Sequence, residues 1–315
     1  MSKIIAVAGA TGAQGGGVVR AILADKSGGF AARALTRDPN SDKAKALADL
    51  GAEVVQADLH DPASVKRAFD GAYGAFCVTF FWNHMSPETE LAEARSMAEA
   101  AKAAKLQHVI WSTLEDTRKS VPLSDNRMPT LMDKYKVPHF DAKGEADALF
   151  EASGVPVTYL VTSFYWENFI YFGMNPKKGP DGKLTLSLPM ADKRLSGIAA
   201  EDIGKAAYAI FKKGPAATAG KRIGIAGEHL TCAEIAAKMG KALGKEITYT
   251  VVPFEVFRNL GFPGADDLGN MFQFYAEFEE QLAATRDLEK TRALNPELQT
   301  FDQWLARNKE RIPLE

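Results

Sequence analysis

Three glycines near the start of the chain have the spacing of a phosphate-binding turn. They stand in Gly9-Ala10-Thr11-Gly12-Ala13-Gln14-Gly15, directly after an apolar stretch at residues 4–8. Gly9 permits a tight turn, Gly12 has no Cβ to keep the backbone away from a pyrophosphate, and Gly15 lets the next helix pack close to its strand. Apolar residues recur at helical spacing over 18–23, so that helix would direct its N-terminal N–H groups at the phosphates. The stretch predicts a dinucleotide-binding site, with a plain structural turn as the alternative.

The residues after the second and third predicted strands would choose the nucleotide. Arg37 follows the strand predicted at 30–36, and its guanidinium suits a 2′-phosphate, which predicts NADP(H). The alternative is that Arg37 is a solvated loop residue and Asp38 accepts from the ribose hydroxyls. Asp58, after the strand predicted at 53–57, can accept from the adenine amino group, whereas Asp61 is predicted to cap the helix at 62–69.

A hydroxyl, an acid and a lysine are the groups that reduction of a carbonyl by a nicotinamide requires. The predicted strand at 108–113 ends in Ser112 and a second hydroxyl, and Lys143 follows on the next helix. In dehydrogenases of this kind a Tyr four residues before the Lys protonates the substrate oxygen. That position is His139, which either donates a proton or only forms local hydrogen bonds at the helix start. Tyr165, after the strand at 157–161, is a second candidate acid, and Lys143 needs only its charge to bind the ribose hydroxyls.

The order of predicted elements defines the fold class. Apolar strands alternate with helices through residue 161, which predicts an α/β fold: a Rossmann-type doubly wound parallel sheet with helices on both faces. We expect a dinucleotide-binding domain at 1–160 and a smaller mixed α/β substrate or partner part at 161–315, with some segments returning to the Rossmann body. Residues 115–137 are polar and irregular, which predicts a mobile loop over the site. The aromatic residues of the C-terminal segment are expected to form core.

Composition narrows the function classes. The formal net charge is -2 and the sequence pI about 6.3, which disfavours direct nucleic-acid binding. No run approaches the roughly 18 apolar residues of a membrane span, and strand one begins too early for a signal peptide, so a cytoplasmic protein is expected. The two cysteines are expected to be inert buried thiols. The histidines are scattered along the chain, so no metal site is predicted.

Several longer motifs resemble those of the NmrA-like family of atypical short-chain dehydrogenases/reductases. The G-x-x-G-x-x-G spacing is similar to theirs, and the likeness extends over essentially the whole chain. The motifs that carry it are residues 9–16, Thr36-Arg37-Asp38-Pro39, residues 51–56, His139-Phe140-Asp141-Ala142-Lys143-Gly144-Glu145, Leu260-Gly261-Phe262-Pro263-Gly264-Ala265, Asn270-Met271-Phe272 and Phe301-Asp302-Gln303-Trp304-Leu305.

The resemblance implies an NADP(H)-binding protein without the active-site Tyr. It assigns Arg37 to the 2′-phosphate, Asp58 to adenine, Thr79 to the inner ribose and Lys143 to the nicotinamide ribose. The pyrophosphate would be held by Gly9, Thr11, Gly12, Ala13, Gln14 and Gly15. Sensor members of the family report the redox state of the nucleotide through regulatory proteins, whereas other relatives reduce quinones or dyes. The first hypothesis is therefore a redox sensor whose candidate partners are a regulatory protein and a second copy of the chain; the alternative is an NADPH-dependent reductase.

Overall fold

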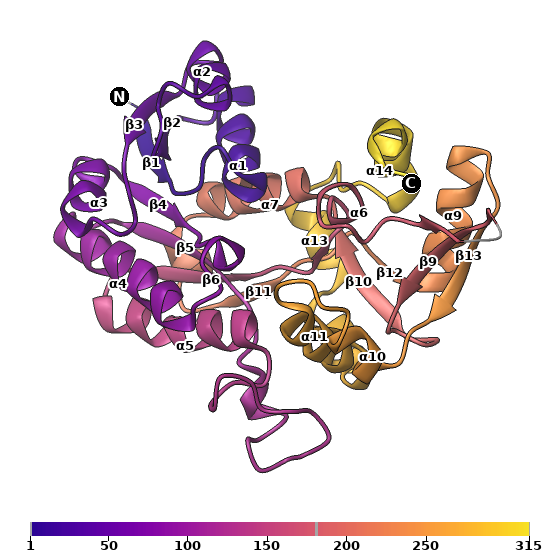
Figure 1. The fold of residues 1–315 in the computed structure, drawn as a ribbon. Coiled ribbons are helices and arrows are strands. Elements are labelled where there is room, and N and C mark those ends of the chain that lie inside the picture. The colour runs from indigo at the N-terminus through magenta and orange to yellow at the C-terminus, as the bar shows by residue number, and fades with distance from the viewer. Residues whose placement is uncertain (1, 180–181, 315) are drawn as a thin grey trace. The chain divides into compact units, whose positions relative to one another are not determined.

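The computed structural model describes residues 2–179 and 182–314, and Figure 1 shows its elements as a ribbon. The chain forms two compact units. The first comprises residues 1–116, 139–162 and 200–223, and the second comprises residues 117–138, 163–199 and 224–315. The chain therefore passes between the units several times. The domain boundary predicted after residue 160 stays a prediction.

A seven-stranded sheet organises the first unit, in the order β11-β6-β5-β4-β1-β2-β3. The paired strands from β3 to β6 run parallel, with Ile5 opposite Ala32 on one side and Gly74 on the other. The strands are β1 (Lys3–Val7), β2 (Phe30–Thr36), β3 (Glu53–Gln56), β4 (Gly74–Cys77), β5 (His108–Thr113), β6 (Val157–Val161) and β11 (Arg222–Gly224). Strand order reverses between β1 and β4, and ligands of such sheets bind at the carboxyl edge of this switch point. The predicted Rossmann-type sheet is confirmed.

Helices surround this sheet, and their apolar faces explain the arrangement. Buried side chains of α3, α4 and α5 pack with the strands in one core cluster that includes Trp111 and Phe150. The helix α1 instead packs on α7, where Gly17 approaches Gly204 closely. The helical segments are α1 (Ala13–Ala24), α2 (Asp42–Asp49), α3 (Pro62–Phe69), η1 (Phe81–Asn83), α4 (Pro87–Ala103), α5 (Pro138–Ser153), α7 (Ala200–Lys213) and α8 (Pro215–Thr218).

The second unit contains two small sheets, ordered β12-β10-β7 and β13-β9-β8. Their strands are β7 (Phe164–Tyr165), β8 (Lys177–Lys178), β9 (Leu184–Leu188), β10 (Arg194–Ile198), β12 (Glu228–Thr231) and β13 (Ile247–Val251). The helical segments are η2 (Thr117–Lys119), α6 (Asn168–Tyr171), α9 (Cys232–Leu243), α10 (Phe254–Arg258), α11 (Ala265–Glu277), α12 (Glu279–Thr285), α13 (Leu288–Leu294), α14 (Phe301–Asn308) and η3 (Lys309–Arg311). As predicted, most aromatic side chains of the C-terminal segment are buried, although Phe262 is exposed.

The loop predicted to be mobile is anchored within the second unit. The amine of Lys136 is buried and donates to Asp125 O, Met128 O and Thr130 Oγ1 at 2.7, 2.7 and 3.0 Å. Asn270 of α11 donates from Nδ2 to the carbonyl oxygens of Pro129 and Lys136. These contacts satisfy main-chain carbonyls that a loop exposes to water, so residues 125–136 have a defined path despite their polar sequence.

Candidate functional site

The glycine turn after β1 has the shape that a pyrophosphate requires. Gly9 has φ +61° and its carbonyl accepts from the Gly12 N–H at 2.8 Å. A Cβ at Gly15 would lie 2.4 Å from Gly9 O, which explains why α1 can begin so close to the turn. Gly12 is the N-cap, and no side chain of the described residues caps α1. The first turn of α1 therefore presents N–H groups and a positive dipole end to an anion, and the turn fits the dinucleotide predicted for it.

Two predicted site residues meet next to this turn. The hydroxyl of Ser112, at the end of β5, donates to Gln14 Oε1 of α1 at 2.7 Å, and both side chains are buried. Thr113 belongs to a different contact, because its hydroxyl donates to Asp147 Oδ1 at 2.7 Å. Ser112 is thus the hydroxyl residue of β5 that contacts the start of α1 beside the glycine turn.

The predicted nucleotide-specificity residues lie at the ends of neighbouring parallel strands. Arg37 is exposed after β2, and Asp58 is half-buried after β3. The backbone N–H of His60 lowers the pKa of Asp58, burial opposes this, and the His60 ring and the charge of Arg37 lower it further. Asp61 caps α3 by accepting from the Ala63 N–H at 3.0 Å, as predicted. Asp58 therefore stays the candidate for the adenine end.

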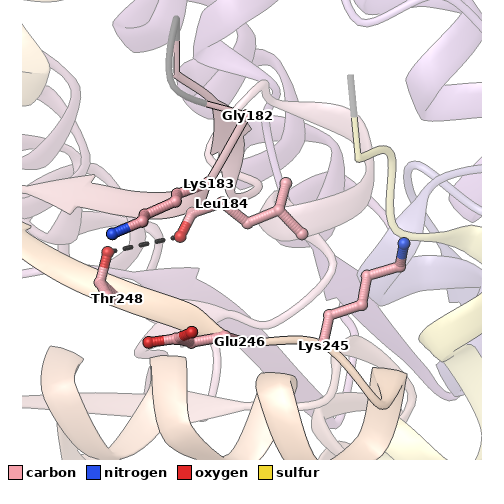
Figure 2. Close-up of a pocket in the computed structure, with 6 residues that line it drawn as sticks. All are labelled: Gly182, Lys183, Leu184, Lys245, Glu246 and Thr248. Atoms are coloured by element: carbon pink, nitrogen blue, oxygen red, sulfur yellow. Dashed lines mark hydrogen bonds between the residues drawn. The ribbon is translucent and has the colours of Figure 1, made fainter.

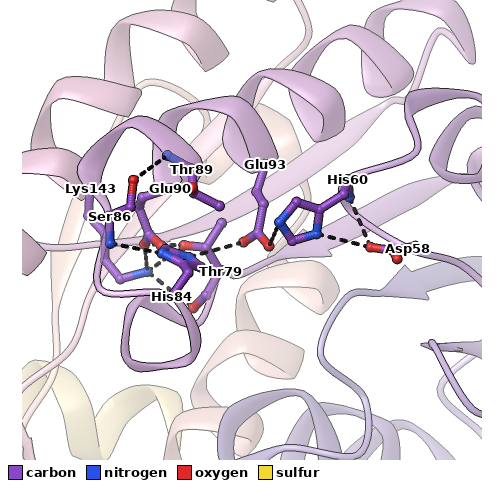
Figure 3. Close-up of polar contacts among 9 residues, drawn as sticks. All are labelled: Asp58, His60, Thr79, His84, Ser86, Thr89, Glu90, Glu93 and Lys143. Carbon is purple, nitrogen blue, oxygen red and sulfur yellow. Dashed lines mark hydrogen bonds and ion pairs between the residues drawn. The ribbon is translucent and has the colours of Figure 1, made fainter.

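Lys143 lies in a buried polar cluster at the carboxyl end of β4 (Figure 3). Its Nζ is 2.6 Å from Thr79 Oγ1, 3.2 Å from Thr79 O and 2.6 Å from Glu90 Oε1. The Thr79 hydroxyl in turn donates to the same Glu90 oxygen. The structure therefore brings together the two residues that the sequence assigned to the ribose hydroxyls, and it adds a carboxylate that the sequence did not assign.

The Glu90 carboxylate is buried completely, so its charge depends on its neighbours. Burial acts to raise the pKa of Glu90, but the charge of Lys143 and contacts with His84 and Thr79 outweigh it and lower that pKa to about 2. Glu93, one turn further along α4, lacks the contact with the lysine amine. Its pKa is raised by burial and by the charge of Glu90. The two glutamates of one cluster therefore ionise differently.

His84 stands beside both carboxylates, and its tautomer follows from its backbone contact. Its Nδ1 accepts from the Ser86 N–H at 3.1 Å, so the proton of the neutral ring is on Nε2. Nε2 is 3.4 Å from Glu90 Oε2 and 3.9 Å from Glu93 Oε2. Ligands of a tetrahedral Zn²⁺ lie at similar separations, roughly 3.4 Å, and these three residues could be taken for a metal site. With Nδ1 accepting from Ser86, the neutral ring presents an N–H rather than a lone pair to the two carboxylates.

The two candidate acids occupy different surroundings. The ring of His139 lies among aromatic side chains, with centroids 4.8 Å from Trp82, 4.7 Å from Phe140 and 5.9 Å from Phe81. It is 6% exposed and one helical turn before Lys143. Tyr165 is half-buried in β7 of the second unit. The structure places His139, but not Tyr165, in the same unit as Lys143.

One open pocket of about 310 Å³ lies in the second unit, at the N-terminal ends of the paired strands β9 and β13 (Figure 2). Polar and charged side chains predominate in its lining, and the hydroxyl of Thr248 donates to Leu184 O at 3.4 Å. None of the predicted cofactor or catalytic residues lines this pocket.

Sequence reasoning missed Glu90, His84 and Glu93. A signal for the glutamates was present, because Glu90, Ala94, Met97 and Ala101 recur at the spacing of one helical face. Acidic residues in the first turn of a helix are also favoured by the helix dipole, so their presence at the start of α4 does not by itself indicate a site. His84 could not be found this way, since only the η1 turn brings it back over α4. The histidines are scattered along the sequence, but the fold brings the rings of His84 and His60 close to Glu93.

The parallel sheet and the glycine turn at its first strand-to-helix junction define a Rossmann-type α/β fold. The NmrA-like family model matches residues 1–305, and the chain belongs to this family.

The curated NmrA-like family domain-containing oxidoreductase FrzB of Cladobotryum sp is 31% identical over 87% of this chain and 84% of its own length. NmrA, a negative transcriptional regulator solved in complex with NADP, has a TM-score of 0.78 at 24% identity, over 97% of this chain and 94% of its own. The same regulator has also been solved in complex with NAD. A triphenylmethane reductase of Citrobacter sp. complexed with NADP(H) has a TM-score of 0.75 at 17% identity, over 98% and 99% of the two chains.

Across residues 2–179 and 182–314, none of the helices combines the length and the apolar character that crossing a bilayer requires.

Proposed function

We propose that this protein is an NADP(H)-binding redox sensor that regulates other proteins and has little or no dehydrogenase activity. One observation supports this most strongly: the glycine turn, Thr79 and Lys143, which we propose as dinucleotide ligands, lie near the switch point, whereas His139 takes the position of the usual proton donor and is packed among aromatic rings. The relatives solved with NAD and NADP(H) support a nicotinamide dinucleotide for this chain too.

Each part of the nucleotide has a proposed partner. The turn from Gly9 to Gly15, with Thr11, Ala13 and Gln14, would hold the pyrophosphate, and the exposed guanidinium of Arg37 would bind the 2′-phosphate. Asp58 would accept from the adenine amino group, and Thr79 with Lys143 would bind ribose hydroxyls. The nicotinamide supplies a hydride when bound. A sensor needs only that its two redox forms bind with different affinity or stabilise different conformations.

The first experiment is titration of the purified protein with NADPH, NADP, NADH and NAD, followed by NADPH oxidation against quinones and imines. Micromolar binding of NADP(H), weak binding of NAD(H) and no turnover support a sensor. Arg37→Ala should remove at least about tenfold of the preference for NADPH over NADH, because a charge-assisted contact with phosphate is lost. Lys45→Ala, which removes an exposed charge on α2, is the control and should leave the preference unchanged. Equal affinities for NADPH and NADH in the unmodified protein would refute the assignment of Arg37.

An NADPH-dependent reductase of quinones, imines or similar small substrates is the second candidate. His139 favours it, since an imidazole one turn before Lys143 can donate a proton near neutral pH. The relatives named as oxidoreductases also favour it. Turnover that His139→Gln or Tyr165→Phe abolishes, with cofactor affinity retained, would establish a reductase and overturn the sensor.

The regulatory partner, the homodimer and the cytoplasmic location stay predictions. Light scattering and affinity capture, each with NADPH and with NADP present, would test the first two. A sensor should change its association between the two nucleotides.

A further inference from the structure

Each of the three hydrogens of the Lys143 ammonium group has an acceptor. Its three donors face Glu90 Oε1, Thr79 Oγ1 and Thr79 O. The Thr79 hydroxyl gives its single hydrogen to Glu90, so it accepts from the lysine. The contact with Thr79 O, at 3.2 Å, is the longest of the three. A ribose hydroxyl can therefore replace the Thr79 carbonyl while the lysine keeps both Glu90 and the Thr79 hydroxyl.

The Lys143 amine needs an anionic partner because it is largely removed from water. Lys143 is 9% exposed, and its Nζ lies 5.5 Å from the centre of the Trp111 ring. A buried lysine that lacks a nearby anion loses its proton readily. The other titratable or charged groups around it are His84 and Glu93, and on its own helix His139 and Asp147. Asp147 is paired with Arg222, and Glu93 faces the histidines, so Glu90 alone of these contacts the amine.

The second oxygen of Glu90 is also constrained. Oε2 is buried and makes no hydrogen bond within the described residues, and His84 Nε2 lies 3.4 Å from it. The Ser86 contact keeps the Nε2 proton directed toward α4. The carboxylate is thus held at one oxygen by the lysine and threonine and faces an N–H at the other.

We propose that Glu90 is the positioning residue of the cofactor site: it keeps Lys143 charged and fixes its amine at the carboxyl edge of β4, where the nicotinamide ribose binds. This inference rests on the proposed binding of NADP(H) but not on whether the protein is a sensor or a reductase. Glu90 itself has no contact with the nucleotide in this proposal.

The test compares Glu90→Gln with Glu93→Gln, the same substitution one helical turn away. NADPH affinity is measured from pH 6 to pH 10 and expressed as the ratio of variant to unmodified protein, which cancels titration of the nucleotide. In Glu90→Gln the ratio should worsen by about tenfold per pH unit once the lysine begins to lose its proton, up to the loss seen in Lys143→Met. In Glu93→Gln the ratio should stay flat.

A double-mutant cycle separates positioning from general damage. If Glu90 acts through Lys143, Glu90→Gln should add almost nothing in the Lys143→Met background. An equal loss in both backgrounds, or a ratio independent of pH, would overturn the proposal. Circular dichroism of each variant checks that it is folded.

NMR of the lysine side chains tests the role of Glu90 without nucleotide, and so separately from the proposed function. The lysine Cε resonances, assigned with Lys143→Met, report the protonation of Lys143 without any nucleotide. A Lys143 pKa that falls in Glu90→Gln supports the positioning role even if the unmodified protein fails to bind NADPH, an outcome that would refute the proposed function alone. An unchanged lysine pKa refutes the positioning role alone.

Discussion

Two buried lysines seven residues apart in sequence make different hydrogen bonds. Lys143 of the first unit pairs with the side-chain carboxylate of Glu90, 53 residues earlier in the chain. Lys136 of the second unit donates to two main-chain carbonyls and a hydroxyl, all within residues 125–130. The first amine is held by a residue of α4, far away in sequence, whereas the second ties together the loop that precedes α5.

The difference shows that burial of a lysine does not by itself mark a functional site. An amine that binds neighbouring main-chain oxygens satisfies carbonyls that would otherwise be unpaired, which is a structural task. An amine that a buried carboxylate keeps charged at the ligand-binding edge of a parallel sheet is suited to binding polar groups of a ligand. Substitutions at the two sites should therefore separate stability from nucleotide binding.

Lys143→Met should have the largest effect. It leaves the Glu90 carboxylate buried without its cation, which typically costs about 3–5 kcal/mol of unfolding free energy. It should also weaken NADPH binding. Urea unfolding with and without nucleotide measures both, and Lys143→Met combined with Glu90→Gln should recover much of the stability.

The pH dependence of the stability lost in Lys143→Met tests whether the loss comes from the ion pair with Glu90. Because the pKa of Glu90 is lowered from 4.5 to about 2, its stabilising contribution is complete above pH 4.5 and is lost as the pH falls toward 2. The gap in stability between Lys143→Met and the unmodified protein should narrow over the same range. A gap that stays constant down to pH 3 would mean that the ion pair is not its source.

Lys136→Met should destabilise the protein by about 2–3 kcal/mol, because it leaves buried acceptors without their donor. NADPH affinity should change less than twofold under conditions where the variant is folded. Chemical unfolding and isothermal titration give the two values. A loss of NADPH affinity as large as that of Lys143→Met would remove the distinction between the two lysines.

Asn270→Ala should have a smaller effect, about 1–2 kcal/mol, since it removes hydrogen bonds to the carbonyls of Pro129 and Lys136. Amide hydrogen exchange should accelerate within residues 125–137 and remain unchanged in α5. Asn259→Ala, at an exposed asparagine of the same unit, is the matched control. Unchanged exchange in the loop would show that α11 does not anchor it.

Glu93→Gln should have the smallest effect and the opposite sign. Because the pKa of Glu93 is raised above 4.5 by burial and by Glu90, its ionisation destabilises the folded state as the pH rises. Removing that charge should give a slightly more stable protein at pH 7 and no gain below pH 4. Thermal unfolding at the two pH values measures this, and a loss of stability at pH 7 would contradict it.

The sequence predicts the Rossmann-type sheet well because each strand carries its own apolar pattern and the glycine turn has a fixed place beside β1. The caps at Asp61 and Thr231 were also predictable, since capping depends on residues only two or three positions apart. Strands β10 and β12 were missed because they pair with each other across 33 residues, with Ser196 opposite His229. Glu90 was missed for the same reason: its partner lies on another helix.

The contact between α1 and α7 affects how the chain folds during its synthesis. A Cβ at Gly204 would lie 2.1 Å from the carbonyl carbon of Gly17. The helix that follows the glycine turn is therefore covered by a helix that comes much later in the sequence. During synthesis the ribosome releases α7 only after some 190 further residues. Until then the apolar side of α1 is open to water and to chaperones. A fragment that ends at residue 160 should therefore aggregate, whereas one extended through residue 224 contains every strand and helix of the first unit.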